Sequence, residues 1–444
     1  FGFNPIGGGG SAEFKNGLPS FELPLADMVK TFQSAGATGY SLNAYFKGSS
    51  IYFGYQFGVA YKINDNISVY GGVRYVAAKN MYEGHLKDIN LVTATGSYAP
   101  SVFMTNLAAT LNAGATTLNG YATNVGNIAT ALGSSEITFD QAIAQTAGNP
   151  TLQGQITAIR NGLTSLGLQN AGSATLALGQ ASFAGAATGY ANSANQITSQ
   201  VPGAAVLTAD QEADVEQTGS GICPIVGVNL SLMESKLNVG LKYEFATKME
   251  VTNKTSKDVI SGFNGTTPVT MFPDGAKIPA DMPALLSVGV SYKMLDKLSV
   301  SSSLYYYFDK SVEYGKKLLK DGQLEYVKND EVIDGNFIDW ALGAEYQLTS
   351  KLLVSTGYMF GKQDVKQTFQ SDMNYSISSH TYCLGGKYSI SPKFDVNLGL
   401  SWSKYEKGKK HAAFSKANPN EIALETYMKD TFIVGVGVDI RLSK

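Results

Sequence analysis

Few side chains in this sequence have the types and spacing that catalysis requires. The chain holds three histidines, namely His85, His380 and His411. Ser378 and Ser379 directly precede His380, but a nucleophile and its base must meet in space, and neighbours in sequence do not form such a pair. We therefore expect no catalytic residue and no enzyme activity. An enzyme is the alternative interpretation, which an assay for lipase or protease activity would test.

Composition narrows the class of protein further. The two cysteines, Cys223 and Cys383, are too few for a disulfide scaffold or a four-ligand zinc site, so we expect no metal and no cofactor. Both fall on the inward phase, where free thiols are expected and a disulfide between them is the alternative. Charged residues make up 16% of the 444 residues, whereas about 25% is usual in soluble proteins. The formal net charge is −2, and without a dominant basic patch we expect no binding to nucleic acid.

Apolar side chains recur at every second position over long stretches. Between Ile51 and Ile63 all odd-numbered residues are apolar, and segments 237–245 and 432–442 repeat the pattern. This period predicts β-strands with one apolar face. The sequence contains no run of about 18 apolar residues, which is the length that a membrane-spanning helix requires. Twelve strands are expected, at 1–9, 49–63, 67–80, 222–233, 237–249, 284–294, 298–313, 336–348, 351–368, 374–390, 393–406 and 427–443.

The connections between these strands alternate between short turns and long loops, as in outer-membrane barrels. Tyrosines such as Tyr61 and Tyr292 precede the short turns, and each following strand rises to another aromatic residue, such as Tyr306 or Trp402. Eight residues of tilted strand span roughly 20 Å, close to the apolar band of a barrel wall. We therefore predict an all-β, transmembrane antiparallel β-barrel. A soluble antiparallel sandwich is the alternative, but its strands average about five or six residues.

The opposite phase of the strands carries Gly, Ser, Asn and charged residues, which would line the lumen because each charge facing lipid costs a few kcal/mol. Arg74 is the first candidate to hold a ligand carboxylate, since a guanidinium binds carboxylates bidentately. Lys242 is the second. Tyr52, Tyr305 and Tyr307 are candidate lining residues of a lumen pocket.

Residues 10–48 are expected to form a long loop with a short helix at 24–34. Its apolar face must pack against the barrel, another loop or a ligand. Packing in a core is one interpretation, and a landing site for a hydrophobic ligand is the functional one. The landing site would comprise Leu18, Phe21, Leu23, Leu25, Met28, Val29 and Phe32.

Segment 94–221 is rich in Ala, Gly, Thr, Asn and Leu, and it has no lysine and one arginine, Arg160. We expect a mostly helical extracellular insertion that caps the barrel or contacts a partner. The expected organisation is therefore barrel strands with the apolar loop in 1–93, the insertion in 94–221, and barrel strands in 222–444.

Three segments resemble the FadL-type outer-membrane channels for long-chain fatty acids and other hydrophobic compounds. They are GGGGSAEFKNGLPSFE (7–22), IYFGYQFGVAYKINDNISVYGGVRY (51–75) and PALLSVGVSYKMLDKLSV (283–300). The resemblance covers nearly all strand regions and leaves out most of 94–221. It implies fourteen strands, an N-terminal hatch in the lumen, and lateral release of ligands through a gap at a kinked strand.

The sequence begins within a strand, so the hatch and the first two strands are expected to be missing, and twelve strands plus two match the family's number. Gly7, Gly8, Gly9 and Gly10 would lie on the kinked strand, where glycine permits a bulge. An ordinary transition from strand to loop explains these glycines as well.

The expected function is passive uptake of hydrophobic molecules, such as long-chain fatty acids, across the bacterial outer membrane by loop capture, lumen binding and lateral release. Outer-membrane lipid and lipopolysaccharide are the expected surroundings. A monomer is the expected oligomeric state. The alternatives are a surface adhesin or partner-binding barrel that uses 94–221, and an open diffusion porin.

Overall fold

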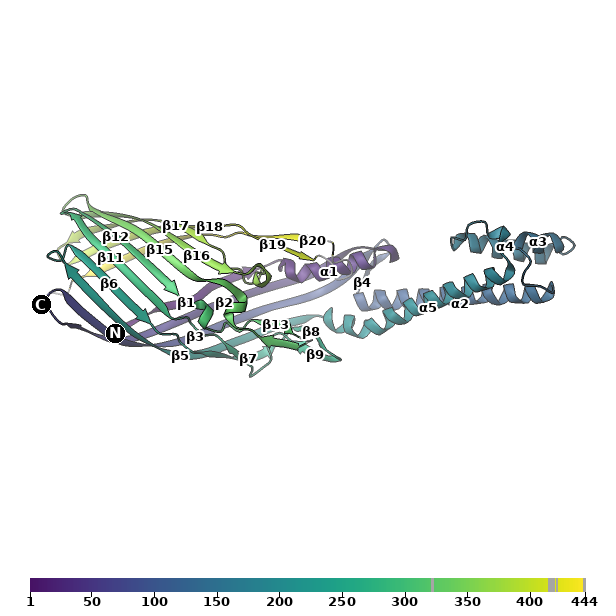
Figure 1. The fold of residues 1–444 in the computed structure, drawn as a ribbon, viewed down its shortest axis with the longest axis horizontal. Coiled ribbons are helices and arrows are strands. Elements are labelled where there is room, and N and C mark those ends of the chain that lie inside the picture. The colour runs from purple at the N-terminus through teal and green to yellow at the C-terminus, as the bar shows by residue number, and fades with distance from the viewer. Residues whose placement is uncertain (321–322, 414–419, 421, 442–444) are drawn as a thin grey trace. The chain divides into compact units, whose positions relative to one another are not determined.

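The computed structural model describes residues 1–320, 323–413, 420 and 422–441. Twelve strands follow one another in a continuous antiparallel path from β1 to β21, and they form a curved wall (Figure 1). They are β1 (Gly2–Phe14), β2 (Ala37–Lys62), β3 (Ile67–Thr93), β5 (Gln211–Leu232), β6 (Leu237–Glu244), β11 (Leu285–Leu295), β12 (Leu298–Tyr307), β15 (Ile333–Gln347), β16 (Leu352–Val365), β17 (Ser379–Ser391), β18 (Phe394–Tyr405) and β21 (Asp430–Ile440). Each predicted strand corresponds to one of them, although positions 442 and 443 of the last predicted strand lie outside the described residues.

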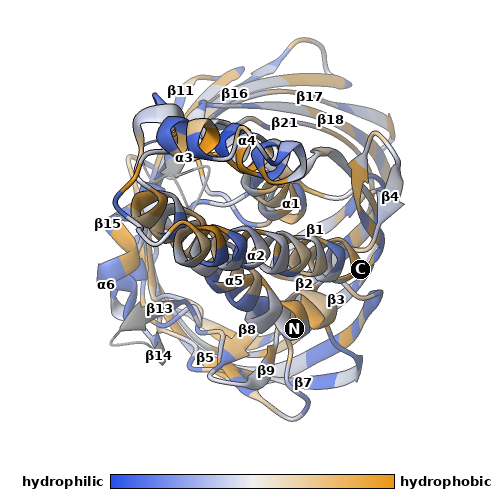
Figure 2. Ribbon diagram, turned by 90° about the vertical axis from the view of Figure 1, so that its right-hand side faces the viewer, coloured by the Kyte–Doolittle hydropathy of each residue, from blue (hydrophilic) through white to orange (hydrophobic). Residues whose placement is uncertain are grey.

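The predicted phase of the strands is also confirmed. Phe57, Leu384 and Val436 expose 64%, 62% and 74% of their surface on the outside of the wall. On the opposite face, Val76 and Glu244 expose 0% and 7%. Hydrophobic and hydrophilic positions alternate along these strands (Figure 2). The apolar side chains therefore face outward, as a lipid-exposed wall requires, and are not buried between two sheets.

Aromatic rings form a row on the outside of four neighbouring strands. The ring centroids of Trp340 and Tyr358 are 6.2 Å apart, those of Tyr358 and Tyr382 are 5.6 Å apart, and those of Tyr382 and Trp402 are 6.0 Å apart. Such amphipathic rings prefer the boundary between membrane and water. The row therefore marks one edge of the apolar band.

Five strands are longer than predicted, and β2, β3 and β5 exceed their predicted lengths by at least ten residues each, whereas β1 and β15 gain fewer. The pairing of β3 with β5 is continuous from Ile67↔Leu230 to Leu86↔Gln211, and β2 begins at Ala37 rather than at 49. The additional residues lack clean alternation because strand beyond the lipid has no apolar outer face to maintain. The loop helix α1 spans Pro19–Thr31 and so begins five residues before the predicted 24.

The segment predicted as a loop at 250–283 contributes further strands to the sheet. β7 (Glu250–Lys257) pairs with β5, and β10 (Lys277–Pro279) pairs with β7. Shorter elements complete the loops. They are β8 (Ile260–Asn264), β9 (Thr267–Thr270), β13 (Lys317–Lys320), β14 (Gln323–Tyr326), α6 (Asn329–Val332), β19 (Gly408–Ala413) and β20 (Ile422–Tyr427).

The chain divides into two compact units, one formed by 1–27, 43–86 and 211–444, and the other by 28–42 and 87–210. The second unit contains β4 (Gly96–Tyr98) and the helices α2 (Pro100–Ala131), α3 (Phe139–Gln145), α4 (Pro150–Ser165) and α5 (Leu176–Leu207). Its core includes Phe139, Leu163 and Phe183, all fully buried. Among the described residues, no helix is both long enough and apolar enough to cross a bilayer.

A cluster of hydrogen-bonded polar groups lies just beyond the end of β12. The Asp309 carboxylate, 2% exposed, accepts hydrogen bonds from Tyr314 Oη at 2.6 Å and from Phe337 N at 3.0 Å. Asn329 Nδ2 donates to the carbonyl oxygen of Asp309 at 3.0 Å. Burial raises the pKa of Asp309 above its usual range despite these hydrogen bonds. The buried carboxyl group of Asp309 is therefore the centre of this cluster.

Because the pKa of Asp309 is raised in the folded state, its contribution to stability is fully present below the usual aspartate pKa and is lost as pH rises through the raised value. We expect the protection of the Phe337 amide from hydrogen exchange, corrected for intrinsic rate, to fall over that range. Asp309→Asn should remove this dependence, whereas Asp330→Asn, at an exposed position of α6, should retain it. An unchanged dependence in Asp309→Asn would contradict the assignment.

Candidate functional site

The inner faces of β2, β3 and β5 carry side chains in successive layers. Alternation places every second residue on this face, and side-chain contacts across the strands join residues of similar character. From the end with the long loops toward the short turns, the layers are aromatic, amide, apolar and charged. Along β2 these residues are Phe46, Gly48, Ser50, Tyr52, Gly54 and Gln56; along β3 they are Tyr82, Asn80, Ala78, Val76 and Arg74; along β5 they are Val215, Gln217, Gly219, Gly221 and Cys223.

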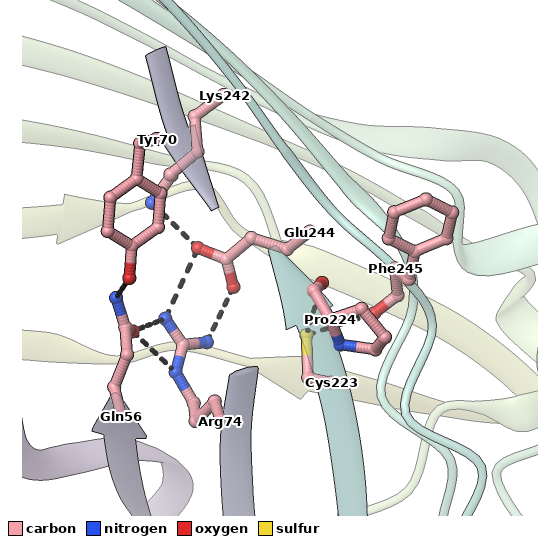
Figure 3. A network of polar contacts seen from close by, with 8 residues as sticks. All are labelled: Gln56, Tyr70, Arg74, Cys223, Pro224, Lys242, Glu244 and Phe245. Carbon is pink, nitrogen blue, oxygen red and sulfur yellow. Dashed lines mark hydrogen bonds and ion pairs between the residues drawn. The ribbon is translucent and has the colours of Figure 1, made fainter. Parts of the chain in front are cut away.

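The charged layer is built around the ion pair of Arg74 and Glu244 (Figure 3). Arg74 Nη1 lies 2.5 Å from Glu244 Oε2, and Nη2 lies 3.3 Å from Oε1. Gln56 Oε1 accepts from Arg74 Nε and Nη2 at 3.1 and 2.7 Å, and Gln56 Nε2 donates to Tyr70 Oη at 2.9 Å. The Arg74 guanidinium therefore already has hydrogen-bond partners within the protein, namely Glu244 and Gln56.

Lys242 is the second cation of this layer, and its Nζ lies 2.6 Å from Glu244 Oε1. The side chains of Arg74 and Glu244 are 13% and 9% exposed, whereas that of Lys242 is 43% exposed. Two cations share one carboxylate, so the three residues together carry one excess positive charge. An excess positive charge next to a partly exposed lysine favours an additional anion.

An apolar layer lies directly beside the charged one. Its buried members are Val76, Ala78, Met249 and Val251, and Ile6, Tyr52, Ile278, Ala280 and Met282 pack against them. The side chain of Ile6 also lies over Gly54, where an added Cβ would be 2.8 Å from Ile6 Cγ2 and 2.9 Å from Arg74 Cδ. The contact joins the apolar layer to the guanidinium stem. Charge and apolar surface thus meet in one place, which suits an amphipathic ligand.

A buried ladder of amides crosses four strands on the other side of the apolar layer. Ser50 Oγ donates to Asn80 Oδ1 at 2.7 Å, and Asn80 Nδ2 donates to Gln217 Oε1 at 3.1 Å. Gln217 Nε2 then donates to Asn253 Oδ1 at 2.8 Å, and Asn253 Nδ2 donates to the carbonyl oxygen of Pro273 at 3.0 Å. Each amide bonds to the next, which compensates the cost of burying it. The ladder ties β2, β3, β5 and β7 together.

The glycines of β1 lie beside the apolar layer and interrupt the strand pairing. Register shifts separate the pairs Pro5↔Phe53, Gly7↔Tyr52 and Gly10↔Ser50. Gly8 has φ of +92°, and an added Cβ there would lie 2.4 Å from the carbonyl oxygen of Ser50. A bulge of this shape requires glycine at position 8. A lateral gap at this bulge stays a prediction.

The other tyrosines predicted to line the pocket lie on β12. Ser287 pairs in register with Lys242 on one side and with Tyr305 on the other, so Tyr305 is two strands away from Lys242. Tyr307 Oη donates to Asp339 Oδ2 at 3.0 Å. Of the predicted lining residues, Tyr52 alone belongs to the apolar layer beside Arg74.

The structure divides the predicted landing site between the two units. In the first unit Leu18 and Leu25 are 4% and 6% exposed, and the ring of Phe21 meets that of Phe46 edge-on at 6.1 Å. Leu23 is half-buried. In the second unit Met28, Val29 and Phe32 pack against a core of Ala37, Leu91 and Phe103. For these three residues, core packing accounts for the apolar helix face.

The alternative of a serine enzyme receives no support from the surroundings of His380. Its Nδ1 lies 2.7 Å from Tyr358 Oη, whereas Ser378 Oγ accepts from the amide of Gln363. Cys223 and Cys383 are both free, the former buried and the latter half-buried. Within the described residues, no group of three or more His, Cys, Asp or Glu could hold a metal ion.

Several residues of the site could not be identified from sequence. Met249 ends the predicted strand 237–249 on its outward phase, but β6 ends at Glu244 and Met249 lies in the inner apolar layer. Val251, Ile278 and Met282 lie in the segment predicted as a loop, which lacks clear alternation. The charges of Arg74, Lys242 and Glu244 were all visible as inward-facing, but they are far apart in the chain, and no local signal pairs them. Only the register of β3, β5 and β6 brings them together.

The lipid-exposed wall and the polar inner face define a transmembrane β-barrel of the outer membrane. A family model described as "Outer membrane protein transport protein (OMPP1/FadL/TodX)" matches residues 161–441, more than half of the chain. The chain belongs to this family.

Known proteins resemble the chain at low identity. Outer membrane protein P1 of Haemophilus influenzae is 28% identical over 179 residues, 39% of this chain and 35% of that protein, so the match spans about a third of this relative. A Pseudomonas aeruginosa FadL homologue aligns with a TM-score of 0.44 at 10% identity, over 90% of this chain and 73% of that one. The Ralstonia pickettii toluene transporter TbuX aligns with a TM-score of 0.41 at 13% identity, over 90% and 78% of the two chains.

Removing the shared carboxylate should destabilise the barrel. Glu244→Gln leaves Arg74 and Lys242 close together without an anion, and we expect a loss of about 3 kcal/mol in the free energy of unfolding. The loss is measured by titrating the protein with denaturant and separating folded from unfolded barrel by their different mobilities on a gel run without heating. Lys62→Ala, which removes the exposed turn pair of Lys62 with Asp65, should change stability little. Equal effects of the two variants would contradict a structural role for Glu244.

Proposed function

We propose that this protein takes up hydrophobic molecules passively across the outer membrane, and that molecules with a carboxylate, such as long-chain fatty acids, bind in the lumen at the charged layer. The single observation that carries the proposal is the contact between the apolar layer and a cluster with one excess positive charge. An alkyl chain would pack against the apolar layer while its carboxylate neutralises the cluster.

The two candidate cations would act differently. Lys242 is the more exposed, so a carboxylate can reach its Nζ without breaking the pair of Arg74 and Glu244. Arg74 makes hydrogen bonds to Glu244 and Gln56, and a ligand that binds it bidentately has to replace Glu244. We therefore assign the first contact to Lys242, and to Arg74 a closer contact made after Glu244 moves.

The relatives support the class of solute at a coarser level. Two similar structures are titled toluene transporters, TbuX of Ralstonia pickettii and TodX of P. putida, the latter with a TM-score of 0.38 at 11% identity over 91% of this chain and 71% of that one. Those names describe the relatives. For this chain they favour a hydrophobic solute. Only the charged layer supports a solute that carries a carboxylate.

Loop capture and lateral release complete the proposed route. Phe21 and Leu23 are half-buried parts of the first unit and are the capture residues we retain. The bulge at Gly7 and Gly8 lies beside Tyr52 in the apolar layer, so a solute held there is next to the interruption in strand pairing. We assign lateral release to this bulge.

The remaining expectations stand as proposals. Outer-membrane lipid and lipopolysaccharide would surround the wall, and a monomer is the expected state. A partner-binding role for the helical second unit is the alternative function. Deleting the insertion and measuring both uptake and cell binding would separate it from transport.

Lys242→Gln should weaken the binding of a fatty acid but not that of the matching fatty alcohol, because only the acid carries a charge. We expect a loss of about tenfold in affinity for palmitate, measured by equilibrium dialysis of the protein in amphipol. Lys293→Gln removes the same charge from a lysine near a short turn, where it pairs with Asp296, and should leave the affinity unchanged.

Equal losses for palmitate and hexadecanol would contradict carboxylate recognition. Unchanged palmitate affinity in Lys242→Gln and in Arg74→Ala would remove both candidate cations from the proposal.

Gly8→Ala should reduce uptake, because a Cβ at this position meets the backbone of Ser50 and the bulge cannot keep its shape. Gly9→Ala is a matched control, since an added Cβ at Gly9 has no neighbour within 4 Å and its φ is not positive. We expect uptake of labelled palmitate by cells to fall several-fold in the first variant only. If both variants transport like the wild type at equal surface expression, lateral release at this bulge is excluded.

A further inference from the structure

Four of the short turns end in the same way. A lysine closes each turn and is followed directly by the first residue of the next strand, which is leucine in three cases and phenylalanine in the fourth. These lysines are Lys236, Lys297, Lys351 and Lys393. The backbone carbonyl oxygen of each accepts a hydrogen bond, at 2.8 or 2.9 Å, from a residue on the neighbouring strand or at its end. The four lysines therefore occupy equivalent positions at the short-turn rim of the wall.

A tyrosine stands next to three of these lysines. The N–H groups that bond to the three lysine carbonyls belong to the residues directly after Tyr292, Tyr346 and Tyr388. Each tyrosine also pairs in register with the leucine that follows its lysine. Among the described residues, neither the Tyr388 hydroxyl nor the exposed Lys351 ammonium has a hydrogen-bond or ion-pair partner. Both groups are donors, so together they suit a phosphate at the membrane boundary.

An apolar hollow of about 370 Å³ opens on the outer face next to Tyr388. Gly386 lines it, two residues before Tyr388 and in register with Val354 and Leu398. The side chains around it share the outward phase and are Leu352, Leu384, Tyr388, Val396, Leu398 and Leu400. Leu384 and Leu398 are 62% and 49% exposed. The missing side chain of Gly386 thus leaves a recess among large apolar residues of the lipid-facing surface.

The glycine distinguishes this turn from the other two. The positions two residues before the other two tyrosines carry Val290 and Ala344. Neither of these residues lines the hollow. Leu352, which does line it, directly follows Lys351. Within the described part of the chain, the turn that ends at Lys351 is therefore the one of the three where an unpaired cation, a free phenol and an apolar recess lie together.

We propose that this recess is a binding site for a phospholipid. One acyl chain would fill the hollow at Gly386, and the headgroup phosphate would accept hydrogen bonds from the Lys351 ammonium and the Tyr388 hydroxyl. The outer face of the wall is in contact with acyl chains, and the short turns lie at the boundary with water, which favours a lipid as the occupant. An acyl chain gains van der Waals contacts in a recess that a smooth wall does not offer. The site lies on the outer face, so the proposal goes beyond the uptake function of the lumen.

Gly386→Leu fills the recess and tests the contact with the acyl chain. The nearest neighbour of an added Cβ would be the Leu353 carbonyl oxygen at 3.4 Å, and the φ of Gly386 is not positive, so the variant should fold. Dioleoyl phosphatidylglycerol is titrated into the full chain in detergent, and native mass spectrometry measures the affinity for the first bound lipid. We expect Gly386→Leu to lower this affinity about fivefold, as the loss of roughly ten van der Waals contacts would. Ala344→Leu, the matched control, introduces the same side chain on β15 outside the hollow and should leave the affinity unchanged.

Lys351→Gln tests the contact with the phosphate. It should lower the affinity for dioleoyl phosphatidylglycerol about fivefold. The affinity for dioleoylglycerol, which has the same chains and no phosphate, should not change. Lys297→Gln is the matched control, because it removes the same charge beside Tyr346, and it should leave both affinities unchanged. Glycerol phosphate at the concentration of the lipid should not displace it, since a headgroup alone leaves the recess empty.

Unchanged affinity in Gly386→Leu, or equal effects of Lys351→Gln and Lys297→Gln, would overturn the phospholipid site. Displacement of the lipid by glycerol phosphate would also overturn it, because the site would then hold a phosphate without a chain. Each of these results would leave the uptake function standing, since none of the variants changes Lys242 or the apolar layer.

Discussion

A chain that crosses hydrocarbon in an extended form must satisfy its backbone hydrogen bonds between neighbouring strands, because lipid offers no partner. The ladder from β1 to β21 meets this requirement between neighbouring strands, apart from local register shifts such as the bulge in β1. The same ladder fixes the alternation of side chains, since successive residues of a strand point to opposite faces. Apolar residues therefore face lipid, and the remaining residues face inward whatever their chemistry. Charged residues can thus lie on the inner face without placing a charge in contact with lipid.

The inner face of β2, β3, β5 and β7 uses this freedom to build layers of different chemistry. Rings, amides, apolar side chains and charges follow one another along the strands, and each layer draws on several of them. In the amide ladder and in the charged cluster, neighbouring polar side chains bond to one another. Arg74 and Glu244 are almost buried, yet both are paired, and the one excess positive charge is placed at the more exposed Lys242. Such an arrangement leaves no unpaired buried charge in the wall, and the carboxylate site that we propose would use the exposed Lys242.

Glycine shapes the site in two different ways. At Gly8 the backbone adopts a positive φ close to the Ser50 carbonyl group, so the missing side chain permits a bulge in β1. At Gly48 and Gly84 the missing side chains let rings of the neighbouring strand lie flat on the sheet. The first use interrupts the wall, and the second covers it with aromatic surface. Both sites lie on β2 and its two neighbours, β1 and β3.

The sequence by itself determined the twelve strands, their phase, and the inward placement of Arg74, Lys242 and Tyr52, because a period of two is a local property that lipid enforces residue by residue. It placed neither the pair of Arg74 with Glu244 nor the inward contribution of Met249 and Met282. Those contacts join residues up to 170 positions apart, and strand register alone brings them together. The helix face of Met28, Val29 and Phe32 shows the same limit, since an apolar stripe looks alike whether it packs in a core or awaits a ligand. Only tertiary structure decides between them, because it supplies the partner.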